Sequence, residues 1–345
     1  MRKFPAALKV LASLALIAAM CGIARAQSGP APAATELKVI AFAGGWNLPI
    51  WVAQRQGFFA QQGLAVQLSF TPSSGFLVDG LMAGRFDLGL AAIDNAIAYQ
   101  EGQGDGVPLK DPDLVAVMGV DSGFLSVVAR PAIASIAELR LRTLGVDSLN
   151  TGFAFVLREL LRRQGVSESE VTFVRGGATE LRFQGLMDGA YDATLLRTPF
   201  EALAAERGFN VLATAEVIGP YLGTSGIVRQ SWARSHEAVL VAFLRAYRRA
   251  MNWLVDPSHR DVAAALLVAN IREMTPALAA HATETLLAAR GGLLRDLEIN
   301  EAAVRTVLAL RSKYGQPPRE LGGVDRYIDL SYRSKALAQP QIASP

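Results

Sequence analysis

Four short stretches rich in glycine and small polar residues could bind a small solute, because each stands between a predicted strand and a predicted helix. They are residues 44–47, 73–75, 147–152 and 176–179. A turn from strand to helix leaves unpaired backbone N–H groups at the helix start, where the helix dipole favours negative charge. Small residues also let a ligand approach the backbone closely. We expect several of these turns to form one binding site, although each could equally be a helix cap or a tight turn.

Polar side chains at predicted strand ends extend this set. Arg197 directly follows the apolar run Ala193–Leu196, and its planar guanidinium could bind two oxygens of a carboxylate or sulfonate. Asp94 and Asn95 follow another apolar run and could accept a donor group of the same solute. The alternative is that Arg197 itself forms an ion pair with Asp94 or Asp147, the acids at the other strand ends. The predicted ligand-binding residues are Trp46, Asn47, Ser73, Ser74, Asp94, Asn95, Asp121, Ser148, Asn150, Thr151, Gly176, Ala178, Arg197 and Tyr221.

Residues that usually carry catalysis or bind metal are scarce in this sequence. The three histidines, His236, His259 and His281, lie in the C-terminal region, and no two of them have the spacing of metal ligands on one helix. There is no G-x-S-x-G elbow and no phosphate-binding P-loop. Asp94 or Asp121 could act as a base, but neither has a partner for it. We therefore predict no catalytic residue, no metal site and no cofactor.

The elements that must position these residues alternate between strand and helix. Apolar runs predict strands, and periodic amphipathic stretches between most of them predict helices. This alternation is typical of a mostly parallel sheet that helices cover on both faces. Predicted strands are residues 37–43, 65–70, 87–92, 114–120, 125–129, 144–146, 171–174 and 193–196; predicted helices are 49–62, 75–83, 95–99, 136–139, 153–164, 176–187, 237–254, 260–270, 276–289 and 300–314.

One segment occurs twice. Gly80–Asp87 reads GLMAGRFD and Gly185–Asp192 reads GLMDGAYD, so five of eight positions are identical. In each copy a predicted helix precedes the segment and a predicted strand follows it. The repeat indicates two lobes of the same architecture, although two similar strand–helix units could also resemble each other by chance.

The first 26 residues have the pattern of a secretory signal peptide. Arg2 and Lys3 precede the apolar run Val10–Met20, and Ala24-Arg25-Ala26 places small residues where signal peptidase cleaves. We predict cleavage before Gln27. The apolar run is about half of the ~20 residues that a membrane span needs. A lipoprotein signal ending at Cys21 is a weaker alternative, because Met20 is a poor fit to the residue that such processing prefers.

Composition restricts the classes of function. The 345 residues are 51% hydrophobic and 19% charged, which excludes a disordered chain. The formal charge is +3, but without residues 1–26 there remain 30 basic and 31 acidic residues. A nearly neutral mature chain gives no electrostatic reason to expect binding to nucleic acid or to an anionic membrane. The only cysteine, Cys21, lies in the predicted signal peptide, so the mature chain would have no disulfide.

The segment 47–66, with the pattern VAxxxGFF followed by GL-x-V, and the segment 81–87 resemble solute-binding proteins of ABC transporters of the sulfonate/nitrate/taurine type. The resemblance covers roughly residues 37–254. It implies an α/β periplasmic binding protein type II fold with two lobes, each a mostly parallel sheet flanked by helices, and a ligand cleft between them. Lobe one would be 36–124 plus 222–335, lobe two 125–221, and 336–345 a disordered tail. Similar proteins often carry Trp and Glu before the proline at 199, whereas this chain has Arg197 and Thr198.

The resemblance also implies a function. The chain would be a periplasmic binding protein, a monomer with no membrane span in its mature form. It would capture a small organic anion, such as a sulfonate or carboxylate, and deliver it to an ABC permease and its ATPase. Alternatives are a sensor that presents ligand to a membrane receptor and an enzyme acting on a small heterocycle. A pyrimidine-synthesising enzyme of related fold uses histidine and a cysteine-rich motif, and we expect neither feature at the cleft of the mature chain.

Overall fold

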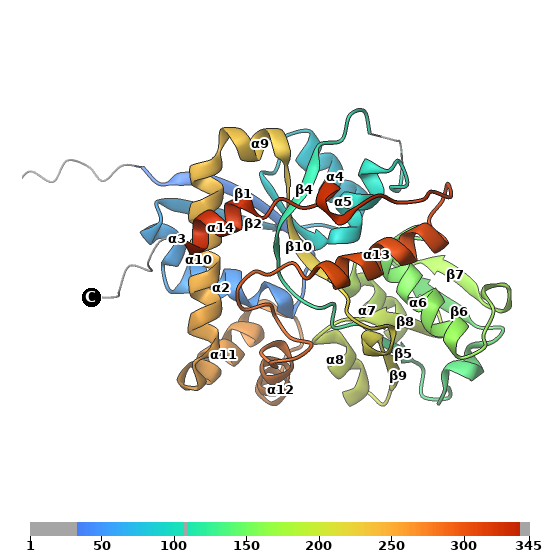
Figure 1. Ribbon diagram of the computed structural model, residues 1–345. Coiled ribbons are helices and arrows are strands. Elements are labelled where there is room, and N and C mark those ends of the chain that lie inside the picture. Colours follow the sequence, from blue (N-terminus) through green and yellow to red (C-terminus); the bar gives the residue numbers. More distant parts are fainter. Residues whose placement is uncertain (1–32, 107–108, 339–345) are drawn as a thin grey trace, which may run out of the picture. The chain divides into compact units, whose positions relative to one another are not determined.

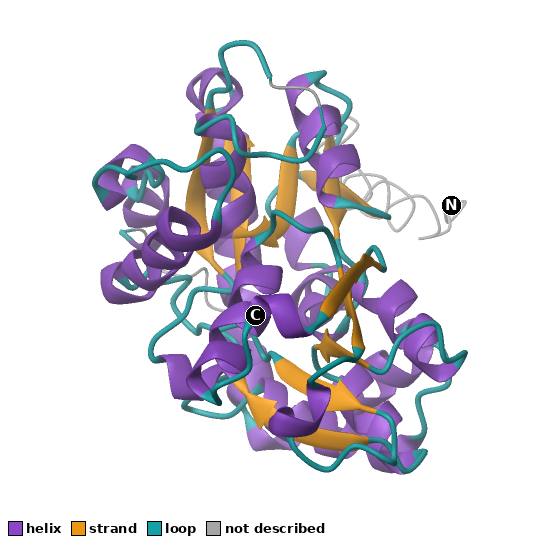
Figure 2. Cartoon of the chain, turned by 90° about the vertical axis from the view of Figure 1, so that its right-hand side faces the viewer, coloured by secondary structure: helices purple, strands orange, loops and turns teal. Residues whose placement is uncertain are grey.

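Two five-stranded sheets organise residues 33–106 and 109–338, the part of the chain that the computed structural model describes (Figures 1 and 2). Each sheet is mostly parallel with one antiparallel strand, β10 in the first and β5 in the second. The first sheet has the order β2-β1-β3-β10-β4 and the second β7-β6-β8-β5-β9. The strands are β1 Thr35–Ala41, β2 Leu64–Phe70, β3 Leu88–Ala92, β4 Leu114–Gly119, β5 Ser126–Ala129, β6 Thr143–Val146, β7 Thr172–Arg175, β8 Ala193–Leu196, β9 Asn210–Thr214 and β10 Thr224–Arg229.

The chain crosses twice between the sheets. It leaves the first sheet after β4 and enters the second at β5, and it returns from β9 to β10 in the middle of the first sheet. The crossing segments are residues 120–125 and 215–223. The two-lobed fold predicted from the sequence is therefore confirmed.

Helices flank both sheets (Figure 2). The long helix α10 packs against α2, α3 and α14 beside the first sheet, and α6 and α7 pack against strands of the second. The helices are α2 Leu48–Arg55, α3 Phe58–Gln61, α4 Ser74–Met82, α5 Ile93–Gln100, α6 Gly152–Arg163, α7 Thr179–Met187, α8 Phe200–Glu206, α9 Gln230–Ser235, α10 Glu237–Val255, α11 Arg260–Asn270, α12 Pro276–Leu286, α13 Glu301–Tyr314 and α14 Ser331–Leu337, with short 3-10 turns η2 Gly45–Asn47, η3 Ile136–Leu139, η4 Glu168–Glu170, η5 Ala215–Ile218, η6 Pro257–His259 and η7 Val324–Arg326.

The repeated segment occupies the same place in both lobes, between α4 and β3 and between α7 and β8. Its final aspartate makes the same contact in each: the Asp87 carboxylate accepts from the Lys38 backbone N–H at 2.8 Å. The Asp192 carboxylate accepts from the Thr143 N–H at 2.9 Å. Its first glycine leaves room for an aromatic ring, since a Cβ on Gly80 or on Gly185 would lie 2.5 Å from the ring or hydroxyl of the aromatic residue six positions later. The two copies of the segment thus make equivalent packing and hydrogen-bond contacts in the two lobes.

Burial on both faces explains the apolar strands. In β1, Val39 faces one hydrophobic cluster with α2 and α10, whereas the neighbouring Ile40 faces another with α4 and α5. A strand that is buried on both faces reads as a continuous apolar run instead of an alternating one. The third cluster joins the lobes, because the apolar face of α13 packs against α5 and also against α6 (Figure 1).

Several predicted boundaries differ from the structure. The expected helix 49–62 is divided at Gly57, which has φ 69° and separates α2 from α3. Strands β9 and β10 were not predicted: β9 is half-exposed, and β10 begins with Thr224, Ser225 and Gly226, which are buried although they are not apolar. Helix α14 continues to Leu337, so the first two residues of the expected disordered tail are helical.

The predicted signal peptide, residues 1–26, lies outside the described residues. Among residues 33–106 and 109–338, no helix combines the length and the apolar content that crossing a membrane requires.

Candidate functional site

A small cavity lies between the lobes, at the edge where the carboxyl ends of both sheets meet. Phe42, Ala92, Asp147 and Arg197 line it, and each directly follows or ends a strand. Ligands of open α/β sheets bind at this edge. The cavity volume is about 20 Å³, room for roughly one water molecule, so the lobes are closed around it. Five of the predicted residues line this cavity: Ser74, Asp94, Asn95, Thr151 and Arg197.

Arg197 is already paired. Its guanidinium donates to the Asp121 carboxylate at 2.8 Å, to the Gly123 carbonyl at 2.7 Å and to the Thr224 hydroxyl at 3.2 Å. It also lies 3.8 Å from the ring centroid of Trp46. Arg197 therefore forms an ion pair, but with Asp121 and not with Asp94 or Asp147, the two acids that the sequence suggested. Asp121 is fully buried and positions the arginine at the cavity wall.

Asp94 is paired as well, with an arginine that the sequence analysis did not consider. Arg311 on α13 donates to both Asp94 oxygens, at 2.5 and 2.6 Å, and both side chains are almost completely buried. The second carboxylate oxygen also accepts from the Gly152 N–H at the start of α6, at 2.7 Å. Gly152 permits this approach, because a Cβ there would lie 2.6 Å from the Asp94 carboxylate carbon. Asp94 thus joins lobe one, lobe two and α13.

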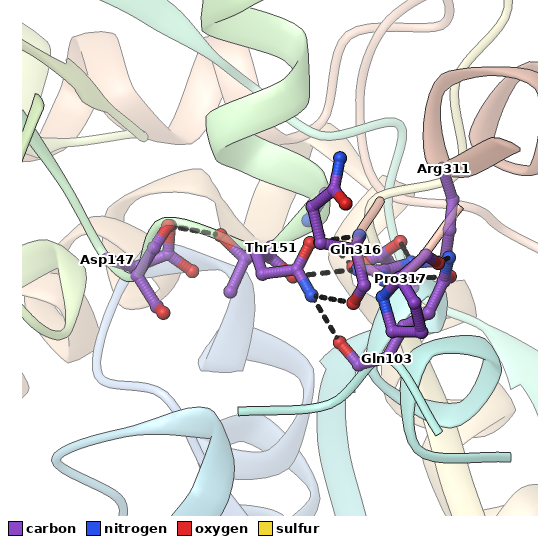
Figure 3. A network of polar contacts seen from close by, with 10 residues as sticks. Gln103, Asp147, Thr151, Arg311, Gln316 and Pro317 are labelled. Carbon is purple, nitrogen blue, oxygen red and sulfur yellow. Dashed lines mark hydrogen bonds and ion pairs between the residues drawn. The ribbon is translucent and has the colours of Figure 1, made fainter. Parts of the chain in front are cut away.

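A network of polar contacts around Asn150 also connects the lobes (Figure 3). The Asn150 side-chain amide donates to the carbonyls of Gln103 at 2.7 Å and Gln316 at 2.8 Å, and its oxygen accepts from the Gln316 N–H. The Asn150 carbonyl accepts from Arg311 at 3.0 Å. Asn150, predicted to bind ligand, here holds lobe two against the C-terminal segment. We call Gln103, Asn150, Arg311 and Gln316 the interlobe network.

A groove of about 470 Å³ lies outside the cavity. It shares Phe42, Ser74 and Asp147 with the cavity, so the two spaces adjoin. Asp105 stands at its wall, where it pairs with Arg175 of β7 at 2.7 Å and accepts from the Ser148 hydroxyl. Three further predicted residues line the groove: Ser73, Ser148 and Ala178. Ser73 also caps α4, since its hydroxyl accepts from the Phe76 N–H at 3.2 Å.

The remaining predicted residues line neither space. Asn47 donates to the carbonyls of Phe42 and Gly44 and closes its own turn, and the Trp46 ring lies behind Arg197. Gly176 packs against the side chain of Arg182. Tyr221 lines a third pocket of about 700 Å³ near the crossing segments, together with Glu201 and Phe124; its hydroxyl is buried and has no hydrogen-bond partner among the described residues. The structure therefore brings eight of the fourteen predicted residues to the cavity and groove.

Arg182 is one of the cavity residues that were not predicted from the sequence. It lies on α7, is 1% exposed and lines the cavity. A signal was present: Thr179, Arg182, Phe183 and Leu186 form the buried stripe of α7, and a lone arginine in such a stripe needs a buried partner.

Two carboxyl groups near these spaces have raised pKa values. Burial raises the pKa of Asp147 above its usual range, although the nearby charge of Arg182 and a hydrogen bond from the Thr151 hydroxyl act in the opposite direction. Burial also raises the pKa of Glu201 to about 7, against the effect of a hydrogen bond from Thr198. Both groups are thus easier to protonate than ordinary surface acids.

Among residues 33–106 and 109–338, no group of three or more metal-binding side chains is arranged around one point. None of the three histidines lines the cavity, the groove or the pocket at Tyr221. The chemistry available at the cavity is therefore that of arginines, carboxyl groups, hydroxyls and two phenyl rings.

Comparisons with known proteins agree with this architecture. The family described as NMT1/THI5 like matches residues 47–259, whereas no curated protein matches the chain in sequence. The periplasmic nitrate-binding protein NrtA from Synechocystis PCC 6803 has 14% identity and a TM-score of 0.72, with 89% of each chain covered. The alkanesulfonate-binding protein SsuA from Xanthomonas axonopodis pv. citri, bound to MOPS, has 16% identity and a TM-score of 0.69 over 87% of this chain and 100% of the other.

A ligand-binding component of an ABC-type import system from Staphylococcus aureus, with zinc bound, has 14% identity and a TM-score of 0.71 over 88% of this chain and 99% of the other. At these identities the likeness establishes the periplasmic binding protein fold.

Proposed function

We propose that this chain, which belongs to the NMT1/THI5-like family, is an exported solute-binding protein that captures a small organic anion and delivers it to an ABC importer. The observation that carries this proposal is the closed interlobe cavity with Arg182 and Arg197 in its wall. Cationic side chains at buried sites bind carboxylate or sulfonate oxygens. Nitrate binding by NrtA, alkanesulfonate binding by SsuA and the ABC import system of the Staphylococcus aureus component support the same class.

Closure around the solute is part of the proposal. The cavity is too small for an organic molecule in the state described here, so the lobes must separate for the solute to enter. The two crossing segments are the places where such a hinge motion can occur. The groove of about 470 Å³ outside the cavity has the size of an ordinary small-molecule site.

A thermal-shift screen tests solute binding. The purified mature protein is unfolded and refolded to remove bound molecules, and is then mixed with sulfonates, aromatic acids and pyrimidines. A true ligand stabilises the folded state by about 2.7 kcal/mol at one hundred times its dissociation constant. The ligand is then recovered and its mass measured, because a binding protein or sensor returns it unchanged and an enzyme does not. No stabilising compound in any class, or a converted one, would contradict the proposal.

Export is the second part that needs a test. The pattern at residues 1–26 supports a cleaved signal peptide and a periplasmic location. N-terminal sequencing of the secreted protein should begin at Gln27. A retained Met1 or a lipid on Cys21 would show that the protein is processed differently.

A further inference from the structure

Three arginines are buried around the cleft, and they differ in how their charge is balanced. Arg197 forms an ion pair with Asp121, and Arg311 forms one with Asp94. Arg182 forms no ion pair with any acid among the described residues. Its guanidinium donates instead to neutral acceptors, the carbonyls of Gly177 at 2.6 Å and Leu195 at 3.1 Å and the hydroxyl of Thr179.

A buried arginine without a paired acid is unusual, because burial of an uncompensated charge is strongly unfavourable. Arg182 is 1% exposed and lines the cavity. The cavity wall therefore presents one positive charge that no carboxylate among residues 33–106 and 109–338 contacts directly.

Asp147 is the complementary case. It directly follows β6 and accepts a hydrogen bond from the Thr151 hydroxyl at 2.7 Å, but it forms no ion pair with a basic residue of the described chain. It lines both the cavity and the groove, so its carboxyl group stands where the two spaces adjoin. The groove wall carries Asp79 and Asp105 as well, and Arg175 neutralises only the latter.

Charge thus changes sign along the path from the cavity to the groove. The inner end has Arg182, which forms no ion pair among the described residues, and the outer part is acidic, with the phenyl rings of Phe42 and Phe153 in the cavity wall. Arg182 and Asp147 lie close enough for their charges to influence each other but form no direct ion pair, so a ligand that lies between them can bind both.

We propose that this site takes an amphoteric solute, whose acidic group binds Arg182 in the inner cavity and whose amino group binds Asp147 at the junction with the groove. This inference rests on the proposed function, since it specifies the solute class of the same cleft. Each of the two contacts is a charge-assisted hydrogen bond, and loss of either lowers affinity about tenfold or more. A simple acid or a simple amine makes only one of them.

Isothermal titration calorimetry with two matched sets of probes tests the class. One set is β-alanine, propanoate and propylamine; the other is 4-aminobenzoate, benzoate and aniline. The amino acid of at least one set should bind about tenfold or more tighter than the acid and the amine of that set. The proposal would be overturned if the acid bound as tightly as the amino acid of its set, or if neither amino acid bound. The proposed function would still stand if the thermal-shift screen had identified another solute.

Two substitutions test the residues. Asp147→Asn should abolish the advantage of the amino acid over the simple acid and leave the binding of the acid unchanged. Asp188→Asn, an exposed aspartate just after α7, is the matched control and should change neither. Arg182→Lys should weaken the acid and the amino acid by the same factor, because lysine cannot reproduce the fork of the guanidinium.

If Arg182→Lys does not fold, Asp147→Asn decides alone. If Asp147→Asn still prefers the amino acid over the simple acid as strongly as the wild type does, the amino group does not bind this carboxylate.

Discussion

At the level of single residues, the cleft shows how ion pairs determine which charges remain available to a ligand. Arg197 and Asp94 are the residues that the sequence most clearly suggested for binding, and both are neutralised by acids or bases from other elements, Asp121 and Arg311. Neither partner is near in the sequence. The pairing therefore removes charge from the two residues at strand ends and leaves it on Arg182 and Asp147.

The Asp94–Arg311 pair should be important for stability. In Arg311→Gln the Asp94 carboxylate stays buried with only the Gly152 N–H as a hydrogen-bond donor, and such a change costs about 3–5 kcal/mol. Urea unfolding at pH 7 measures it. Arg305→Gln on the same helix is the control, since the Arg305–Glu301 pair is exposed and should contribute less than about 1 kcal/mol. Equal losses in the two variants would contradict the structural role of Asp94.

Glu201 should make stability depend on pH. Burial raises the pKa of Glu201 from its usual 4.5 to about 7, so the folded state holds a proton that the unfolded state has released. The contribution of this protonation to the free energy of unfolding is complete below pH 4.5 and is lost as the pH rises towards 7. Glu201→Gln should remove this dependence and stabilise the protein at pH 8 by about 2 kcal/mol, after allowance for the part of the side chain that solvent reaches.

The measurement is the free energy of unfolding from pH 5 to pH 8. Glu206→Gln, an exposed glutamate at the end of the same helix, should leave the pH dependence as in the wild type. A wild-type curve that rises with pH over this range and is unchanged in Glu201→Gln would show that Glu201 is charged in the folded state.

At the level of elements, α13 is the helix that ties the lobes together. Glu159 of α6 accepts hydrogen bonds from Lys313 at 2.9 Å and Tyr314 at 2.8 Å of α13, as well as from Arg162 and Arg163 of its own helix. The Tyr314 ring also stacks on Phe155 of α6, with centroids 6.0 Å apart. The same helix pairs with α5 of lobe one through Asp94, so α13 contacts both lobes.

Glu159→Gln tests this contact. Hydrogen bonds, first of all from Arg162, hold the pKa of Glu159 well below its usual range. Its contribution is therefore complete above pH 4.5 and is lost as the pH falls below that value. The variant should be about 2 kcal/mol less stable at pH 7, and the difference should narrow from pH 4.5 to pH 3.

Glu168→Gln is the control, because Glu168 pairs with Arg158 at 51% exposure. A loss in Glu159→Gln that does not depend on pH would mean that packing, and not the charge of Glu159, joins α6 to α13.

Most elements could be predicted because local pattern and tertiary burial agree. The apolar runs at β1, β3 and β4 are buried on both faces, and the repeated GLM segment has an aspartate and a glycine with the same role in each lobe. Strand β10 could not be predicted, because Thr224, Ser225 and Gly226 have no apolar signal and become a central strand only by pairing with β3 and β4.

The site was predictable only in part, for a related reason. Turns at strand ends can be located from the sequence, and three of the four predicted turns, 73–75, 147–152 and 176–179, reach the cavity or groove with most of their residues. Whether a charged side chain is neutralised depends on partners that can be as far away in the sequence as Arg311 is from Asp94. No local pattern contains that information.

At the level of the whole molecule, the interlobe network and the Asp94–Arg311 pair hold the lobes together in the closed state. Opening must break the contacts of Asn150 with Gln103, Gln316 and Arg311. Asn150→Ala removes the side-chain contacts and should shift the ligand-free protein towards the open state. Small-angle scattering should then show a larger radius of gyration than in the wild type.

Asn210→Ala is the matched control for that experiment, because Asn210 bonds to carbonyls within lobe two only. Its scattering should equal that of the wild type. If Asn150→Ala also scatters like the wild type, the interlobe network does not determine closure.

The most direct test of the central claim, that the interlobe cleft binds a small solute, is mass spectrometry of molecules released from the protein. The ligand-free wild type and Asp147→Asn are each equilibrated with the same periplasmic extract, re-isolated and denatured, and the released small molecules are quantified. One solute should be recovered in a near-equimolar amount from the wild type and in a much smaller amount from Asp147→Asn. Equal amounts from both proteins would contradict only the assignment of the amino group to Asp147, whereas recovery of no solute from the wild type would contradict solute binding at this cleft.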